Sequence, residues 1–185
     1  MVPSGDSTLR KKIYYKVGKI VVKRKRLNDA HTLIFTPHFP YNAKKESSMR
    51  HRALLGIGGN VGDVLRRFGY LFFYMKRQGL VHIVETSPLL KNPPFGFRDQ
   101  DDFINGLILI ETDMMPRQLL HYVLRAEKRF GRKRLFKDGP RTLDIDLIFY
   151  EDITMQSREL TLPHPGWMQR SSVLIPLAKM KKVAV

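Results

Sequence analysis

The sequence predicts an α+β fold in which an antiparallel sheet is covered by helices. Two observations support this prediction. Segments with strand-like and helix-like hydrophobic patterns follow one another in the order βαββαβ, and glycine or proline residues separate them. This order is typical of a ferredoxin-like sandwich. The chain has 185 residues, of which 43% are hydrophobic, so one sizeable core and a shorter extension are expected.

The first half of the pattern is a strand, a helix and a second strand. "ALLGIGGN" (53–60) is an apolar strand that runs into a glycine turn. The helix follows at 63–79, with Asp63 as its N-cap and Gly79 as its stop. "LVHIVETS" (80–87) is a short strand. The apolar residues of the helix recur at helical spacing, at Val64, Phe68, Phe72 and Met75.

The second half begins with a Pro-rich polar segment, "PLLKNPPFGFRDQDD" (88–102), which predicts a loop without regular structure. Strands are then expected at 103–112 and 142–150. The segment 115–131 between them predicts a helix that starts at Pro116 and ends at Gly131. Its predicted buried face carries Leu120, Val123, Leu124 and Glu127.

A boundary near residues 47–49 divides the chain into an extension, 1–48, and a domain, 49–185. The segment "NAKKESSMRHR" is polar and turn-prone, and a buried strand follows it. Within the extension, 12–27 and 31–35 are β-rich with basic ends, so two or three strands that add to an edge of the main sheet are expected. The alternative is that much of the extension is mobile.

The chain is strongly basic, with a formal net charge of +16. The first 50 residues hold 12 Lys and Arg against 3 Asp and Glu, so weak electrostatic binding of polyanions to the extension is expected. Cysteine is absent, which excludes disulfides and thiolate ligands and fits a reducing cytoplasm. Without a signal peptide or a membrane span, we expect a soluble cytoplasmic protein, a monomer or a dimer, with no membrane partner.

Two acidic residues interrupt the apolar strand 142–150. Side chains alternate along a strand, so Asp144 and Asp146 share one face while their apolar neighbours point to the other. Neighbouring carboxylates raise each other's pKa unless a cation lies between them. Mg²⁺ prefers a few carboxylates together with phosphates and water, so the pair predicts a magnesium site. The alternative is a solvated strand face with incidental acids.

Cations surround this pair in the sequence. Arg141 follows a Gly-Pro turn, and the segment 132–137 is a basic loop. Arginines beside metal-binding carboxylates are typical of phosphoryl-transfer sites, where they neutralise charge on phosphate. Taken alone, the basic loop is interpreted as a solvated surface.

Three further motifs are weaker. Phe95, Phe97 and Phe103 lie near Asn105 and can enclose a flat heterocycle, although core packing of these rings is the favoured interpretation. His164 stands between prolines, where it either meets a phosphate or is an ordinary turn histidine. "GIGGN" lacks the spacing of a phosphate-binding loop and is interpreted as a turn.

Together these segments resemble the 6-hydroxymethyl-7,8-dihydropterin pyrophosphokinase family of folate biosynthesis, from about Ala53 to Met180. "KDGPRTLDIDLI" is the most specific part, and "GIGGNVGD", "NPPFGFRDQDDFIN" and "LPHP" occur in the right order. The resemblance implies that the pterin hydroxymethyl oxygen attacks the β-phosphorus of ATP, the co-substrate, and that AMP is released.

The resemblance also implies roles for individual residues. Asp144 and Asp146 are expected to hold two Mg²⁺ ions that bridge the ATP phosphates. The expected catalytic arginines are Arg132, Arg134 and Arg141. The expected pterin-binding residues are Asn92, Pro93, Pro94, Phe95, Phe103 and Asn105. The expected nucleotide-binding residues are Glu127, Arg132, Arg141, His164 and Arg170. For Glu127, a buried salt bridge at the helix end is an equal alternative.

The chain departs from the family pattern in four places. Asp138 stands where the family often has tryptophan. Ser171, Ser172 and Val173 occupy the region of a second pterin-stacking aromatic, for which Trp167 is a candidate substitute. The basic loop is one residue shorter than usual, and the N-terminal extension has no counterpart in the family.

Two other classes of function compete with this one. A nucleic-acid-binding protein would use the basic extension, and its binding would weaken steeply with salt. Deletion of residues 1–48 would then abolish that binding and leave the pyrophosphokinase activity. A two-metal phosphohydrolase would use the same two aspartates and turn over ATP without an acceptor.

Overall fold

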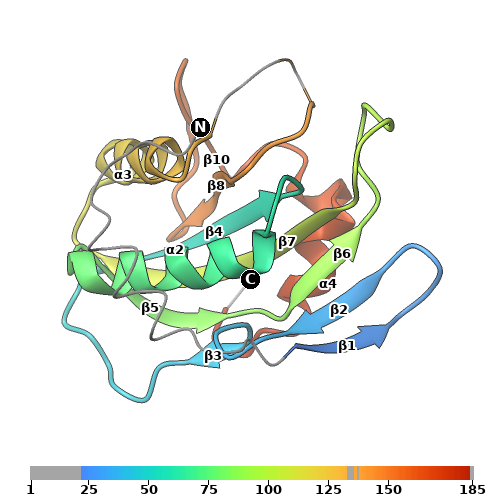
Figure 1. The fold of residues 1–185 in the computed structure, drawn as a ribbon. Helices are drawn as coiled ribbons and strands as arrows, with labels where there is room; N and C mark the ends of the chain where they lie inside the picture. The colour runs from blue at the N-terminus through green and yellow to red at the C-terminus, as the bar shows by residue number, and fades with distance from the viewer. Residues whose placement is uncertain (1–21, 133–135, 137, 184–185) are drawn as a thin grey trace.

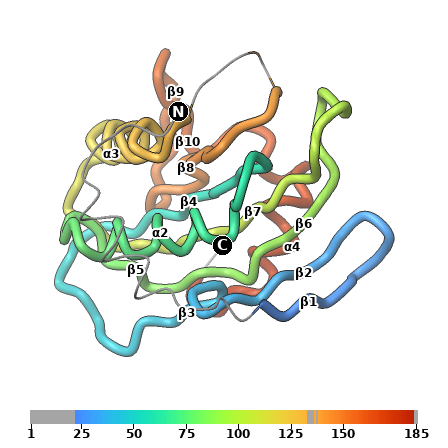
Figure 2. The backbone as a smooth tube through the Cα atoms, in the orientation of Figure 1, coloured from blue at the N-terminus to red at the C-terminus, as the bar shows by residue number. Residues whose placement is uncertain are grey.

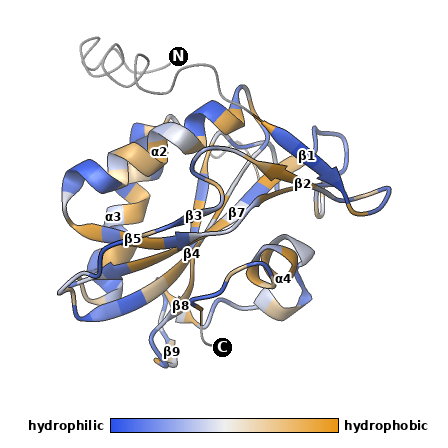
Figure 3. Ribbon diagram, turned by 90° about the horizontal axis from the view of Figure 1, so that it is seen from below, coloured by the Kyte–Doolittle hydropathy of each residue, from blue (hydrophilic) through white to orange (hydrophobic). Residues whose placement is uncertain are grey.

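The computed structural model describes residues 22–132, 136 and 138–183 (Figure 1). It confirms an α+β protein with a large antiparallel sheet. In the described part, the helices are α2 (Val64–Gln78), α3 (Pro116–Arg129) and α4 (Ser171–Leu177), with a 3-10 turn η1 (Trp167–Gln169) before α4. α2 and α3 cover one face of the sheet, and the short α4 lies on the other face (Figure 3).

Five long or central strands build the sheet. They are β4 (His51–Gly59), β5 (Val81–Thr86), β6 (Leu89–Asn92), β7 (Phe103–Thr112) and β8 (Asp144–Tyr150). β4 pairs with β8 on one side and β7 on the other, and β5 and β6 follow one another along the far edge of β7. A small hairpin of β9 (Met155–Gln156) and β10 (Thr161–Leu162) follows β8.

Strands before residue 48 join this sheet. They are β1 (Lys23–Arg26), β2 (Thr32–Phe35) and β3 (Tyr41–Asn42). β2 pairs with β1 and β6, and β3 pairs with β5, so the β1–β2 hairpin extends the sheet beyond β6 (Figure 2). The expected strand residues 12–21 lie outside the described residues. The division of the chain into two domains stays a prediction.

Both long helices were predicted, and local chemistry explains their ends. Asp63 Oδ1 accepts a hydrogen bond from the Arg66 backbone N at 3.0 Å, and Gly79 adopts φ 67° at the end of α2. The predicted face of α3 was partly wrong, because Leu124 is 44% exposed. The buried face instead carries Leu119, Tyr122, Val123, Ala126 and Glu127.

The prediction of an irregular loop over 88–102 was also partly wrong. Residues 89–92 form β6, and Leu89 and Leu90 are fully buried. The pairing partners explain this difference, because β6 lies between β7 and β2, and sequence alone did not reveal β2 as a partner. Pro88 and the part after Asn92 have no regular structure.

The sheet separates two hydrophobic cores. The larger one packs α2 and α3 against the sheet, and the smaller one packs Val173 of α4 against the opposite face. This smaller core leaves part of that face uncovered beside α4. None of the helices in the described ranges is long and apolar enough to cross a membrane.

Candidate active site

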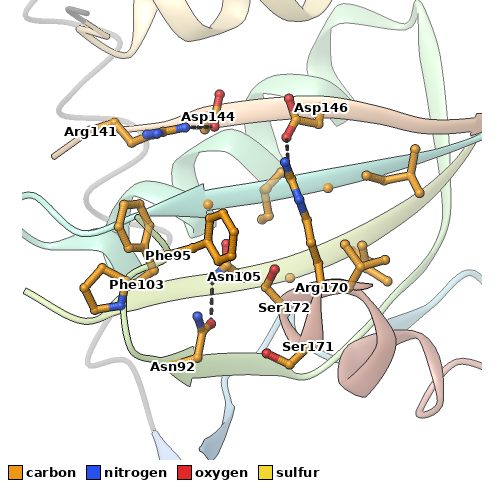
Figure 4. Close-up of a pocket in the computed structure, with 18 of the residues that line it drawn as sticks. Asn92, Phe95, Phe103, Asn105, Arg141, Asp144, Asp146, Arg170, Ser171 and Ser172 are labelled. Carbon is orange, nitrogen blue, oxygen red and sulfur yellow. Dashed lines mark hydrogen bonds and ion pairs between the residues drawn. The ribbon is translucent and has the colours of Figure 1, made fainter. Parts of the chain in front are cut away.

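A pocket of about 240 Å³ opens on the α4 face of the sheet (Figure 4). Its floor is the surface of β4, β7 and β8, and its walls come from the loop after β6, the segment before β8, and the start of α4. The polar and charged residues that line it are Asn92, Asn105, Asp138, Arg141, Asp144, Asp146, Gln169, Arg170, Ser171 and Ser172.

Strand register places the floor residues in two rows. Asn105, Gly58 and Asp144 lie opposite one another on β7, β4 and β8, and Gly56 lies opposite Asp146. A Cβ on Gly58 would lie 2.6 Å from Asn105 Oδ1. Only glycine leaves the Asn105 amide in place there. The glycines of "GIGGN" therefore belong to a strand, and the interpretation of Gly58 as part of a turn was wrong.

Asp144 and Asp146 share the pocket face of β8, as the alternation predicted, and Ile145 between them is buried in the larger core. The Arg141 guanidinium forms an ion pair with Asp144, and Arg132 Nη2 lies 2.7 Å from Asp144 Oδ1. The charge of Asp144 is thus already balanced by two arginines.

Arg132 also forms an ion pair with Glu127 at the end of α3. Glu127 Oε1 accepts a hydrogen bond from the Ile145 backbone N at 2.7 Å, and the residue is 2% exposed. Of its two predicted roles, this geometry favours the buried salt bridge. Glu127 and Arg132 connect α3 to Asp144 from beneath, and neither lines the pocket.

Asp146 has weaker compensation. His164 Nε2 and Arg170 Nη1 each lie 3.8 Å from Asp146 Oδ2, beyond hydrogen-bond distance. Burial raises the pKa of Asp146, and the neighbouring charge of Asp144 raises it further. A cation beside Asp146 would favour its ionised form and so offset both effects.

These residues fit Mg²⁺ as a pair of oxygen ligands. In the part of the chain that the structure describes, no group of three or more His, Asp or Glu residues could hold a metal ion. If Asp144 and Asp146 hold the ion, phosphate oxygens and water would complete the coordination.

The opposite end of the pocket is built from amides and aromatic rings. Asn105 Nδ2 donates a hydrogen bond to Asn92 Oδ1 at 2.7 Å (Figure 4). The Arg141 guanidinium lies 5.7 Å from the centre of the Phe103 ring, between the two ends of the pocket. Core packing was wrong for two of the rings, because Phe95 is 87% exposed at the pocket and Phe97 is 41% exposed.

Sequence reasoning missed Asn60, which joins three segments at the edge of the site. Its Oδ1 accepts from the Arg141 backbone N at 3.0 Å. Its Nδ2 donates to Gln100 Oε1 at 2.9 Å and to the Asp101 backbone O at 3.0 Å. Asn60 is 7% exposed, so these bonds are shielded from water. An Asn after a strand and two glycines was the available signal.

Gln100 and Asp138 extend this connection. Gln100 Nε2 donates to the Asp138 backbone O at 2.8 Å, and the rings of Phe97 and Phe136 meet edge to face with centroids 5.2 Å apart. The loop after β6 thus packs against the segment before β8. Asp138, which replaces the expected aromatic, adopts φ 59° and contributes to the pocket lining.

The remaining predicted residues divide into two groups. Pro93, Pro94 and Arg170 line the pocket, whereas His164 contacts Asp146 from outside the lining. Arg134 lies outside the described residues. Trp167 does not take the place of the missing stacking ring, because it packs edge to face on Phe149 with ring centroids 4.7 Å apart. Ser171 and Ser172 occupy that wall instead.

The chain is similar in sequence to proteins of one family. Residues 54–182 match the family model described as 7,8-dihydro-6-hydroxymethylpterin-pyrophosphokinase. A 2-amino-4-hydroxy-6-hydroxymethyldihydropteridine pyrophosphokinase from Helicobacter pylori is 41% identical over 142 residues, which cover 76% of this chain and 87% of the relative. Its counterpart from Campylobacter jejuni is 40% identical over 139 residues, 75% of this chain and 88% of the relative.

Proposed function

Because this chain belongs to the 7,8-dihydro-6-hydroxymethylpterin-pyrophosphokinase family, and so acts as a pyrophosphokinase of folate biosynthesis, we propose that the pocket beside α4 is its active site. The observation that supports this most strongly is the common pocket of Asp144, Asp146, Arg141 and Arg170 at one end and Asn105 at the other. This arrangement can hold a polyphosphate and a hydrogen-bonding heterocycle side by side.

The acceptor, 6-hydroxymethyl-7,8-dihydropterin, occupies the end with Asn92 and Asn105. An amide presents both a donor and an acceptor to the edge of a heterocycle. The Asn105 amide is held by Asn92 through one donor, so its orientation is fixed before the ligand binds. Phe103 and Phe95, with the Pro93–Pro94 backbone, cover the faces of the ring.

ATP occupies the charged end, with its phosphates between β8 and the start of α4. Arg141 and Arg170 contact the phosphates. His164 lies beside Asp146 and helps to hold this carboxylate at the nucleotide end of the pocket. Asp144 and Asp146 would hold two Mg²⁺ ions, whose charge would neutralise the phosphates.

Catalysis depends on positioning and charge. The acceptor hydroxymethyl oxygen attacks the β-phosphorus, its proton is lost, and the bond between the α,β-bridging oxygen and the β-phosphorus breaks, so AMP leaves. Arg141 lies between the two ends of the pocket, where negative charge develops during transfer. Arg132 and Glu127 hold Asp144 in place from beneath and do not touch the substrate.

Two finer structural features belong to the same proposal. The order β8, β4, β7, β5 supports a ferredoxin-like βαββαβ arrangement of the catalytic domain, residues 49–185. We assign residues 1–48 to an extension of that domain.

A product assay tests the proposal and separates it from phosphohydrolysis. With ATP and Mg²⁺, AMP formation should require the dihydropterin, and it should be lost in Asp144→Ala and in Asp146→Ala. ATP turnover without the acceptor would favour the phosphohydrolase, and full activity of both variants would exclude this site.

A further inference from the structure

The β1–β2 hairpin lies outside residues 54–182, the part of the chain that matches the family, yet it reaches two walls of the pocket. On one side, Thr32, Leu33 and Ile34 of β2 pair with β6. β6 carries Asn92, which orients Asn105. Without the hairpin, β6 would be an edge strand with one row of unpaired backbone groups.

Strand register extends the floor of the pocket into this hairpin. Directly opposite residues on paired strands share a face of the sheet. One such row crosses from β1 to β8 through Lys25, Leu33, Leu90, Asn105, Gly58 and Asp144. Leu33 is 2% exposed and Leu90 is fully buried, so the hairpin is packed as part of the sheet.

The turn of the hairpin makes a second contact, with α4. His31 Nε2 lies 3.3 Å from Ser171 Oγ, the first residue of α4 and a residue of the pocket lining. The ring is oriented from its other side, where Nδ1 lies 3.0 Å from Asn28 Oδ1. Asn28 Oδ1 also accepts from the backbone N of Ala30 and His31, which fixes the turn.

We propose that this hairpin positions the acceptor-binding walls, and that His31 is a positioning residue that acts through Ser171. The inference rests on the proposed binding of the acceptor beside Asn92 and Asn105. At this wall the chain has Ser171 and Ser172. A serine hydroxyl binds a ligand through directed hydrogen bonds, whereas an aromatic ring would bind it through surface contact. Directed hydrogen bonds require that the first residues of α4 keep a fixed position. The contact of His31 with Ser171 holds them there.

Two basic residues of β1, Lys23 and Arg24, do not carry this role. Like Lys25 and Arg26, they are exposed on an edge strand, where charge prevents pairing with other chains. Arg26 differs because it contacts the turn, where its Nε donates to the Asn28 backbone O at 3.3 Å. The pocket depends on β2 and on the turn, so changes at Lys23 and Arg24 should leave substrate binding unaffected.

Steady-state kinetics of the full-length protein test the role of His31. His31→Ala should raise KM for the dihydropterin about two- to fivefold, the effect of one exposed hydrogen bond, with kcat and KM for ATP unchanged. His31→Gln can still reach Ser171 and should restore KM. His121→Ala is the matched control, because His121 is exposed on α3, across the sheet from the pocket. Thermal unfolding of each variant reports any general loss of stability.

A double-mutant cycle with Ser171→Ala shows whether the effect passes through Ser171. If it does, His31→Ala should have no further effect on KM in the Ser171→Ala background. The same increase in both backgrounds would overturn the proposal, as would a wild-type KM for His31→Ala. Turnover by the wild-type enzyme is measured first, so failure of the proposed function is distinguished from failure of this inference.

Discussion

Asn60→Ala is the substitution that most sharply tests how the site is held together. It removes three side-chain hydrogen bonds, to the Arg141 backbone N, to Gln100 Oε1 and to the Asp101 backbone O. Each is worth about 1 kcal/mol net, so about 2–3 kcal/mol of support for the two pocket loops is lost. Two of these bonds hold the loop after β6, and the third holds the backbone of Arg141.

If this support serves the positioning of Arg141 in the transition state, kcat/KM should fall about 30- to 100-fold, because about 1.4 kcal/mol corresponds to a factor of ten. This kcat/KM is measured from the rate of AMP formation at saturating ATP and a range of dihydropterin concentrations. Asn42→Ala, the same exchange at an exposed position on β3, should change nothing. A kcat/KM within twofold of wild type for Asn60→Ala would refute the role of these bonds.

Three further outcomes are expected. Gly58→Ala should raise KM for the dihydropterin at least tenfold, measured by AMP formation, because the new methyl group would displace the Asn105 amide. Asp146→Asn should raise the unfolding temperature without Mg²⁺ at neutral pH. The raised pKa of Asp146 makes wild-type stability fall as pH rises from the ordinary aspartate pKa to the raised one, and the variant should lose this slope. Burial and the charge of Lys76 lower the pKa of His38, so the native state resists protonation of this residue and loses stability as the pH falls. In His38→Phe, the free energy of unfolding, measured by chemical unfolding, should therefore fall less between pH 7 and pH 5 than in the wild type.

The elements that the sequence predicted well are those with local signals. Asp63 and Gly79 mark the ends of α2, and the alternation around Ile145 places both aspartates on one face. The strand β6 was missed because its burial depends on β2, a partner more than 50 residues away in the chain. The short helix α4 has no comparable local signal, since Pro176 interrupts its sequence.

The candidate site divides in the same way. The aspartate pair and Arg141 were found because two acids in an apolar strand are unusual wherever they occur. Asn60 was missed because it acts through hydrogen bonds to three partners that only the fold brings together. The role of Gly58 was also missed, because the reason for a glycine there is the Asn105 side chain on the neighbouring strand. Long-range contacts of this kind leave no pattern in a single sequence.

The position of the transferred phosphorus shows whether the enzyme passes diphosphate from ATP to the pterin. ATP labelled at its β-phosphorus is mixed with the dihydropterin, Mg²⁺ and either the wild-type enzyme or Asp144→Asn/Asp146→Asn, and the products are separated. We expect the wild-type enzyme to pass the label to the pterin diphosphate and to release unlabelled AMP in equal amount, and we expect the double variant to do neither. Labelled ADP from the wild-type enzyme, or label transfer by the double variant at the wild-type rate, would contradict it.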